Sequence, residues 1–185
     1  MGANLNMTKY IQNITDKIVQ VVKTENKMLM HISNQKSNSR IGIFNMPELG
    51  FAYECGKQIM QNANEIFEGN IPEWSRETQL ENGGLTDLVF SFNDGTKIAI
   101  EFKMRDTSDA YISDIKKLSE IKNNQVTKIF CAIVDTMEKD LPYDGRVRNI
   151  NEDERTKELY LESFKTNQSW YKSNVYALIG LWIVV

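Results

Sequence analysis

The spacing of hydrophobic residues predicts an alternation of helices and strands along the chain. In residues 4–34 the hydrophobic side chains recur at helical spacing, and they do so again from Pro47 to residue 67 and between residues 108 and 123. Shorter segments rich in β-branched and aromatic residues predict strands at 74–80, 85–92, 96–104, 128–134 and 170–185. Between the last two strands we expect a charged loop at 136–150 and a helix with few hydrophobic residues at 152–167.

Two of the predicted helices have a hydrophobic face suited to covering a sheet. The first helix carries Leu5, Ile11, Ile14, Ile18, Val21, Val22 and Met28 on one side. The helix after Pro47 has an inward stripe of Leu49, Ala52, Tyr53, Gly56, Ile59, Met60, Ala63 and Phe67. We expect the first helix to pack on the core of its own chain, and pairing with its equivalent in a homodimer is the alternative.

The segment 85–104 predicts a β-hairpin whose register follows from its turn. Asn93-Asp94-Gly95 predicts a three-residue loop that pairs Phe92 with Thr96. The residue numbers of two facing positions then add up to 188, so Asp87 lies opposite Glu101. Because side chains alternate along a strand, one face is hydrophobic and the other carries the polar groups. The hydrophobic face consists of Leu88, Phe90, Phe92, Ile98, Ile100 and Phe102, and the polar face carries Asp87, Glu101 and Lys103. A two-residue loop would separate the carboxylates and break up the hydrophobic face.

The polar face of this hairpin suggests a metal site. Carboxylates that face each other repel, and a bound cation would offset that repulsion. Their oxygen ligands suit Mg²⁺ or Mn²⁺, which lowers the pKa of a bound water and stabilises charge on a phosphoryl group. Lys103, one side-chain step beyond Glu101, could orient the attacking water or help to deprotonate it. The alternative is a solvated sheet face on which the three residues have no special role.

The segment 45–135 resembles the PD-(D/E)XK nuclease superfamily, which has the restriction-endonuclease-like fold. Asp87, thirteen intervening residues and Glu101-x-Lys103 match its motif, with Thr86 replacing the proline that often precedes the aspartate. The predicted elements also follow its order, α-β-β-β-α-β. The resemblance implies an α/β fold in which a central mixed β-sheet is flanked by helices, and it implies a metal-dependent phosphodiesterase.

Many members of this superfamily add a glutamate from the first core helix, and two are available here. At 100° per residue, Glu48 lies roughly 80° from the centre of the inward stripe and Glu54 roughly 160°. Glu48 can therefore face the sheet, whereas we expect Glu54 to face solvent. Glu48 also has an alternative role, because an acid in the first turn stabilises the helix dipole. We expect Asp87 and Glu101 to hold the ion with the Phe102 carbonyl, and Glu48 to complete the shell or bind a second ion.

Length, charge and cysteine content agree with a single globular domain. We expect residues 1–185 to form one nuclease-like domain, with 1–40 as an N-terminal helical extension, 45–135 as the core and 136–185 as a C-terminal loop, helix and strand. Cys55 and Cys131 lie in hydrophobic patterns without metal-ligand spacing, which suits buried thiols in the cytoplasm. We expect no signal peptide, because the N-terminus is polar, and we expect the last hydrophobic segment to be a buried strand, because it is too short to cross a membrane.

The expected function is metal-dependent endonuclease activity on nucleic acid, with DNA as the preferred substrate and Mg²⁺ or Mn²⁺ as the cofactor. The net charge of −3 is unusual for a nucleic-acid-binding protein and suggests weak non-specific affinity. Two basic pairs, Lys116 with Lys117 and Arg146 with Arg148, could contact phosphates, but such pairs are usually solvated surface residues. The alternatives are an inactive domain of the same fold that binds nucleic acid or protein, and a dimeric interaction protein with an inert polar face.

Overall fold

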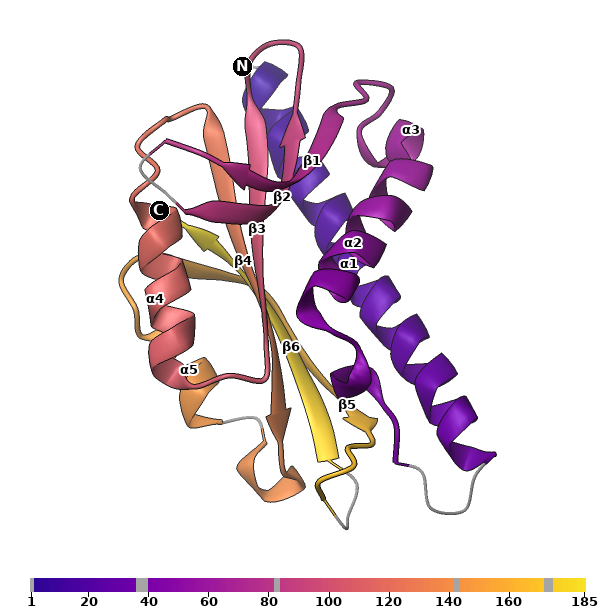
Figure 1. Cartoon of the computed structure of the whole chain (residues 1–185). Coiled ribbons are helices and arrows are strands. Elements are labelled where there is room, and N and C mark those ends of the chain that lie inside the picture. The colour runs from indigo at the N-terminus through magenta and orange to yellow at the C-terminus, as the bar shows by residue number, and fades with distance from the viewer. Residues whose placement is uncertain (1, 36–39, 82–83, 142–143, 172–174) are drawn as a thin grey trace.

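A mixed six-stranded sheet forms the centre of the computed structural model, which describes residues 2–35, 40–81, 84–141, 144–171 and 175–185 (Figure 1). The strand order is β1-β2-β3-β4-β6-β5. The strands are β1 (Glu73–Gln79), β2 (Leu85–Ser91), β3 (Lys97–Met104), β4 (Val126–Thr136), β5 (Thr156–Thr166) and β6 (Val175–Val184). Because β3 and β4 are parallel and the other neighbouring pairs are antiparallel, the sheet is mixed, as predicted.

Helices cover both faces of this sheet (Figure 1). One face is covered by α1 (Gly2–Asn34) and α2 (Glu48–Gln61), with the short elements η1 (Ile43–Asn45) and α3 (Ala63–Ile66) beside them. The other face is covered by α4 (Ser108–Ser119) and α5 (Gly145–Asn151), and η2 (Glu138–Asp140) follows β4. The order α2-β1-β2-β3-α4-β4 is the predicted α-β-β-β-α-β order.

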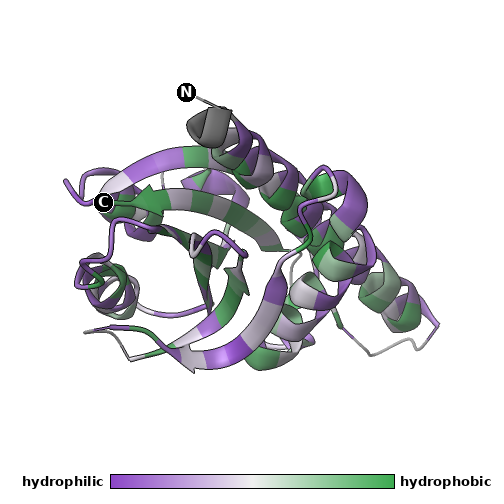
Figure 2. Cartoon of the chain, turned by 90° about the horizontal axis from the view of Figure 1, so that it is seen from above, coloured by the Kyte–Doolittle hydropathy of each residue, from purple (hydrophilic) through white to green (hydrophobic). Residues whose placement is uncertain are grey.

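Two hydrophobic cores form, one on each side of the sheet. On the first side, Ile14 and Ile18 of α1 and Phe51 of α2 pack with Phe90 and Ile100. On the second side, residues of α4 and α5 pack against the opposite face of β3, β4 and β6, including Tyr111, Ile115, Val147, Ala99, Phe130 and Trp182. The central strands are accordingly hydrophobic over much of their length, which Figure 2 shows from above. None of the described helices is long and hydrophobic enough to cross a membrane.

The hairpin has the register that the sequence predicts. The Phe92 N–H donates to the Thr96 carbonyl at 2.9 Å, and Gly95 adopts a φ of 86°, as a three-residue loop requires. Leu88 pairs with Ile100 and Phe90 pairs with Ile98. The hydrophobic residues of both arms lie on the α1–α2 side of the sheet, so the polar face of the hairpin is turned toward α4.

The first helix is integral to this architecture. Asn26 of α1 donates to the Lys165 carbonyl of β5 at 2.9 Å, and its amide oxygen accepts from the Ile43 N–H at 3.2 Å. Lys23 pairs with Glu162 of β5 at 2.7 Å. The helix therefore packs on the core of its own chain. The side chain of Leu5 lies outside the described residues, and Met28 is exposed, contrary to its predicted place on the inward face.

The C-terminal third differs from the prediction. The predicted helix at 152–167 is wrong, because residues 156–166 form β5 and pair with β6 along its whole length. The predicted loop at 136–150 contains α5. As an edge strand, β5 keeps many charged side chains in solvent and buries little, so its sequence lacks the hydrophobic content of a central strand. Pairing with the hydrophobic β6 then decides its conformation.

Candidate functional site

The candidate site begins where β2 and β3 separate. The ladder between these strands ends at the pair Leu88 and Ile100, one step before Asp87 would pair with Glu101. At that step an Asp87 carboxylate oxygen accepts a hydrogen bond from the Phe102 N–H at 2.8 Å. The side chain thus replaces a strand partner and holds the Asp87 carboxylate beside β3. Burial raises the pKa of Asp87, against the opposing effect of this hydrogen bond.

Glu101 is the most deeply buried acid of the site, with 6% of its surface exposed. Its Oε1 pairs with the Lys117 ammonium of α4, which also donates to the Leu85 carbonyl at 3.1 Å. Its Oε2 is buried and has no hydrogen-bond partner among the described residues. Burial, followed by the charge of Asp87, raises the pKa of Glu101 to about 7.

Lys103 lies on the same face of β3 and also contacts α4. Its ammonium is 3.0 Å from Oδ2 of Asp114 and 3.9 Å from Asp106. Burial disfavours the charged form, but the hydrogen bond and charge of Asp114 outweigh it, so the pKa of Lys103 is raised. A protonated lysine cannot accept a proton from water. Of the two roles that the sequence suggests for Lys103, this arrangement supports orientation of the water.

Glu48 and Glu54 of α2 lie in different surroundings. Glu48 is the first residue of α2, and one of its carboxylate oxygens accepts from the Met104 N–H at 2.7 Å. Burial raises the pKa of Glu48, against the effect of that hydrogen bond, and the charges of Lys103 and Asp87 also act on it. Glu54 pairs with Lys57 at 2.5 Å and lines a hollow between α1 and α2. Its side chain is only 16% exposed, so it faces α1 rather than open solvent, away from the site.

The donor set where the strands separate fits a hard divalent cation. Asp87 uses one oxygen to accept from Phe102 and Glu101 uses one to bind Lys117, so each carboxylate has a second oxygen to offer. Mg²⁺ is commonly held by one or two carboxylates together with water and phosphate oxygens. No three acidic, histidine or cysteine side chains of the described part of the chain are grouped to hold a metal, so Glu48 does not complete such a group here. The arrangement fits a two-carboxylate site.

Asp114 and Lys117 also contact this site, although the sequence indicated no role for Asp114 and suggested Lys117 only as a phosphate contact. Both flank the buried face of α4 formed by Tyr111, Ile115 and Leu118. Lys117 had been expected to be a solvated surface residue, and that prediction is wrong because it pairs with the buried Glu101. Lys116, its neighbour, is exposed as expected. The sequence contains one signal for this role: two opposite charges border the hydrophobic face of the helix.

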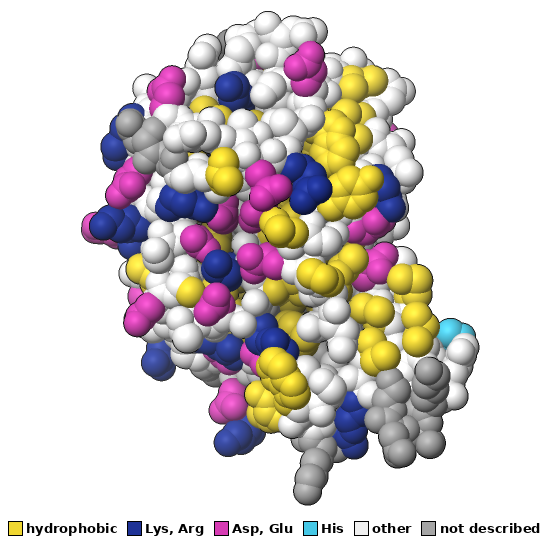
Figure 3. Space-filling model, viewed as in Figure 1, with side chains coloured by type: hydrophobic (Ala, Val, Ile, Leu, Met, Phe, Trp, Pro, Cys, Tyr) yellow, Lys and Arg dark blue, Asp and Glu magenta, His cyan; other side chains and the backbone are white. Residues whose placement is uncertain are grey.

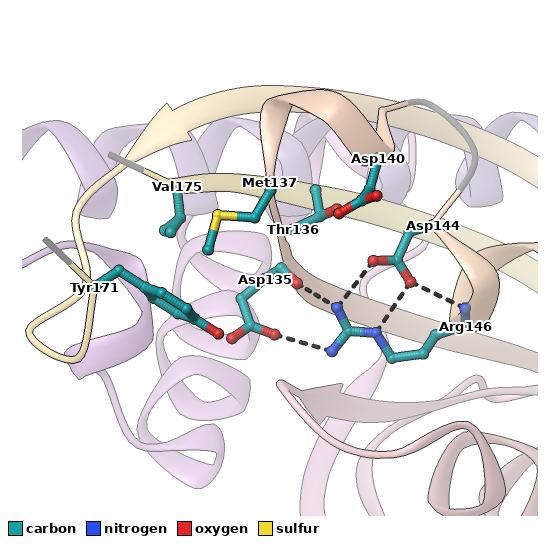
Figure 4. Close-up of a pocket in the computed structure, with 8 residues that line it drawn as sticks. All are labelled: Asp135, Thr136, Met137, Asp140, Asp144, Arg146, Tyr171 and Val175. Atoms are coloured by element: carbon teal, nitrogen blue, oxygen red, sulfur yellow. Dashed lines mark hydrogen bonds and ion pairs between the residues drawn. The ribbon is translucent and has the colours of Figure 1, made fainter. Parts of the chain in front are cut away.

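The second predicted basic pair does not form an open phosphate-binding surface. Arg146 is enclosed by Asp144 and Asp135, with N–O distances of 2.9 Å to each, in a pocket of about 180 Å³ (Figure 4). Only Arg148 of the pair is exposed. On the face seen in Figure 3, basic and acidic side chains are interspersed rather than separated.

Comparisons with known proteins add little to this geometry. No protein family and no curated protein matches the chain. A solved structure, the crystal structure of a repair endonuclease from Pyrococcus abyssi, is similar over 41% of this chain and 34% of that chain, with 25% identity and a TM-score of 0.28. The similarity thus spans about a third of the length of that protein, and a TM-score this low carries no argument about function.

Proposed function

We propose that this chain is a metal-dependent nuclease that hydrolyses phosphodiester bonds in nucleic acid, with DNA as the expected substrate. The observation that carries the proposal is the pair of carboxylates at the separation of β2 and β3. Glu101 is buried beside Asp87, and one of its oxygens has no partner among the residues that the structure describes. Lys103 lies one side-chain step away. A buried acid in this position is costly unless a cation compensates its charge.

Each residue of the site has a role that follows from its contacts. Asp87 and Glu101 would hold Mg²⁺ or Mn²⁺ with the Phe102 carbonyl, and the ion would supply an activated water and charge stabilisation. Lys103, held by Asp114, would orient the water and the phosphate through its ammonium. Glu48 would bind a water of the metal shell or a second ion if it exchanged its bond to Met104.

Lys117 has a separate role in this proposal. Its ammonium neutralises Glu101 from the side of α4 and also binds the carbonyl of Leu85. It thereby compensates the buried carboxylate when no metal is bound. Loading of a cation at Glu101 would weaken this pair, and the ammonium would then be free to contact a phosphate.

Cleavage assays with Mn²⁺ on single-stranded DNA, double-stranded DNA and RNA test the proposal. Asp87→Ala and Lys103→Ala should lower the cleavage rate by roughly a hundredfold or more, because Asp87 would hold the ion and Lys103 would orient the water and the phosphate. Glu54→Ala is the matched control, since it removes an acid from α2 outside the site and should leave the rate unchanged. Wild-type protein that cleaves none of these substrates, or variants that cleave as fast as wild type, would contradict the proposal.

A second candidate is a catalytically inactive domain of this fold that binds nucleic acid without cleaving it. The observation in its favour is the ion pair between Lys117 and Glu101, which satisfies one oxygen of the carboxylate without metal. The same assays separate the two candidates. Binding of nucleic acid without Mn²⁺-dependent cleavage, unaffected by Asp87→Ala, would support the inactive domain.

A further inference from the structure

Trp170 is the most exposed large hydrophobic side chain among the described residues, with 70% of its surface in solvent. It lies in the segment between β5 and β6, and its indole ring is covered by the guanidinium of Arg105 at 3.7 Å from the ring centroid. An exposed indole buries no core surface, so it contributes little to folding. A flat aromatic ring beside a cation offers both a stacking surface and a charge, which is the combination that binds unpaired bases.

Arg105 connects this ring to the candidate site. It directly follows Met104, whose N–H is bound by Glu48, and its own N–H donates to the Ile133 carbonyl at 2.8 Å. Its φ of 50° is uncommon for a residue with a side chain. Arg105 also borders a hollow of about 290 Å³ whose other lining residues include Glu48 and Met104. The indole and its guanidinium therefore lie beside an opening that leads to an acid of the site.

A second arginine, in addition to Arg105, lies near Trp170. Arg40 is exposed and donates to the carbonyl of Tyr171, the residue that follows Trp170, at 2.8 Å. Asp135 and Asp144, which line a pocket together with Tyr171, are both paired with Arg146 (Figure 4). Arg146 offsets one of these two negative charges, and Arg105 and Arg40 place two further guanidinium groups close to Trp170.

We propose that Trp170 and Arg105 form a stacking platform that holds an unpaired base of a single-stranded nucleic acid next to the candidate site. The inference rests on the proposed function, because it names the substrate class that the site would receive. Stacking on the indole is indifferent to base identity, since every base has an aromatic face. Arg105 would hold the ring from one side and contact the adjoining phosphate.

Binding measurements without metal test this platform independently of cleavage. The probes are fluorescein-labelled oligothymidylate and a blunt duplex of equal length, in EDTA and low salt. Trp170→Leu keeps a hydrophobic side chain and removes the aromatic face, whereas Trp170→Phe keeps an aromatic face and removes the indole fluorophore. Tyr53→Leu is the matched control. Contrary to its predicted place on the inward stripe of α2, Tyr53 is exposed, and it lies beside an arginine, Arg76 at 5.3 Å.

We expect Trp170→Leu to raise the Kd for the single strand about tenfold, as loss of one stacked base predicts. Trp170→Phe and Tyr53→Leu should change that Kd by less than about threefold. Unlabelled oligothymidylate should also quench the fluorescence of wild-type protein, and this quenching should disappear in Trp170→Phe. The duplex should bind wild type and Trp170→Leu equally.

Two results would overturn the platform. One is an equal Kd for the single strand in wild type and Trp170→Leu, with circular dichroism showing that both are folded. The other is the absence of single-strand binding by wild type. Failure of the proposed function can be told apart from failure of the platform. In that case the single strand would still bind in a Trp170-dependent way, but it would not be cleaved after Mn²⁺ is added.

Discussion

The pKa of Glu101 reflects the main electrostatic effects in the site, because burial and a neighbouring acid raise it and a single lysine lowers it. Burial and the charge of Asp87 raise the pKa of Glu101 to about 7, and the ion pair with Lys117 limits the rise. The folded protein therefore retains a proton on Glu101 at pH values where an unfolded chain has released it. A cation at this position would reverse the balance, because it favours the charged carboxylate.

Glu101 should make the metal-free protein less stable as pH rises from about 5 to about 8. Its folded-state pKa of about 7 lies above the ordinary value of 4.5, so the stabilising contribution is complete below 4.5 and is lost as pH passes through 7. Glu101→Gln removes this titration and should gain on the order of 1–3 kcal/mol relative to wild type between these limits. Urea unfolding in EDTA at several pH values measures the free energy of unfolding of both proteins. If this free energy changes equally with pH in wild type and Glu101→Gln, the predicted effect of Glu101 is excluded.

At the scale of elements, the site depends on how closely α2 packs against the sheet. Gly56 faces Trp74 of β1 and Leu88 of β2, and a Cβ atom there would overlap the Trp74 ring. This close approach brings the start of α2, and with it Glu48, to the end of β3. On the other side of the sheet, α4 supplies Asp114 and Lys117, so two helices and two strands define the site.

Gly56→Ala should destabilise the protein by about 1–3 kcal/mol, because the added methyl group has no room between α2 and the sheet. Gly50→Ala is a matched control in the same helix. Its nearest contact would be at an ordinary 3.6 Å, so alanine should stabilise α2 by about 0.5–1 kcal/mol. Chemical denaturation of the three proteins measures both effects, and a neutral Gly56→Ala would show that the helix is free to move away from the sheet.

The sequence predicted the elements whose structure is decided locally. The hairpin followed from alternation and its turn, and with it came the positions of Asp87, Glu101 and Lys103 on one polar face. The edge strand β5 was not predicted, because its charged sequence has no strong strand signal and only pairing with β6 determines it. Asp114 and Lys117 were missed for a similar reason, since their proximity to β3 arises from the packing of α4. The catalytic and metal-binding roles of the predicted residues stay predictions.

At the scale of the whole molecule, the sheet separates two cores, and the ladder between β2 and β3 ends before the strands do. Strands β2 and β3 diverge between α2 and α4, and acidic and basic groups from all four elements meet there. The net charge of −3 gives no general attraction for a polyanion. Affinity for nucleic acid must therefore come from local contacts, and it should be weak at physiological salt.

The central claim is that Asp87 and Glu101 together bind a divalent cation. The most direct measurement is an anomalous difference map from crystals grown with Mn²⁺, because manganese scatters anomalously and takes the same oxygen ligands as Mg²⁺. We predict a peak within coordinating distance of both carboxylates, with the Lys117 ammonium displaced from Glu101, and no peak in Asp87→Ala crystals. The account would be contradicted by a map from crystals grown in excess Mn²⁺ in which Lys117 still binds Glu101 and no manganese lies near either carboxylate.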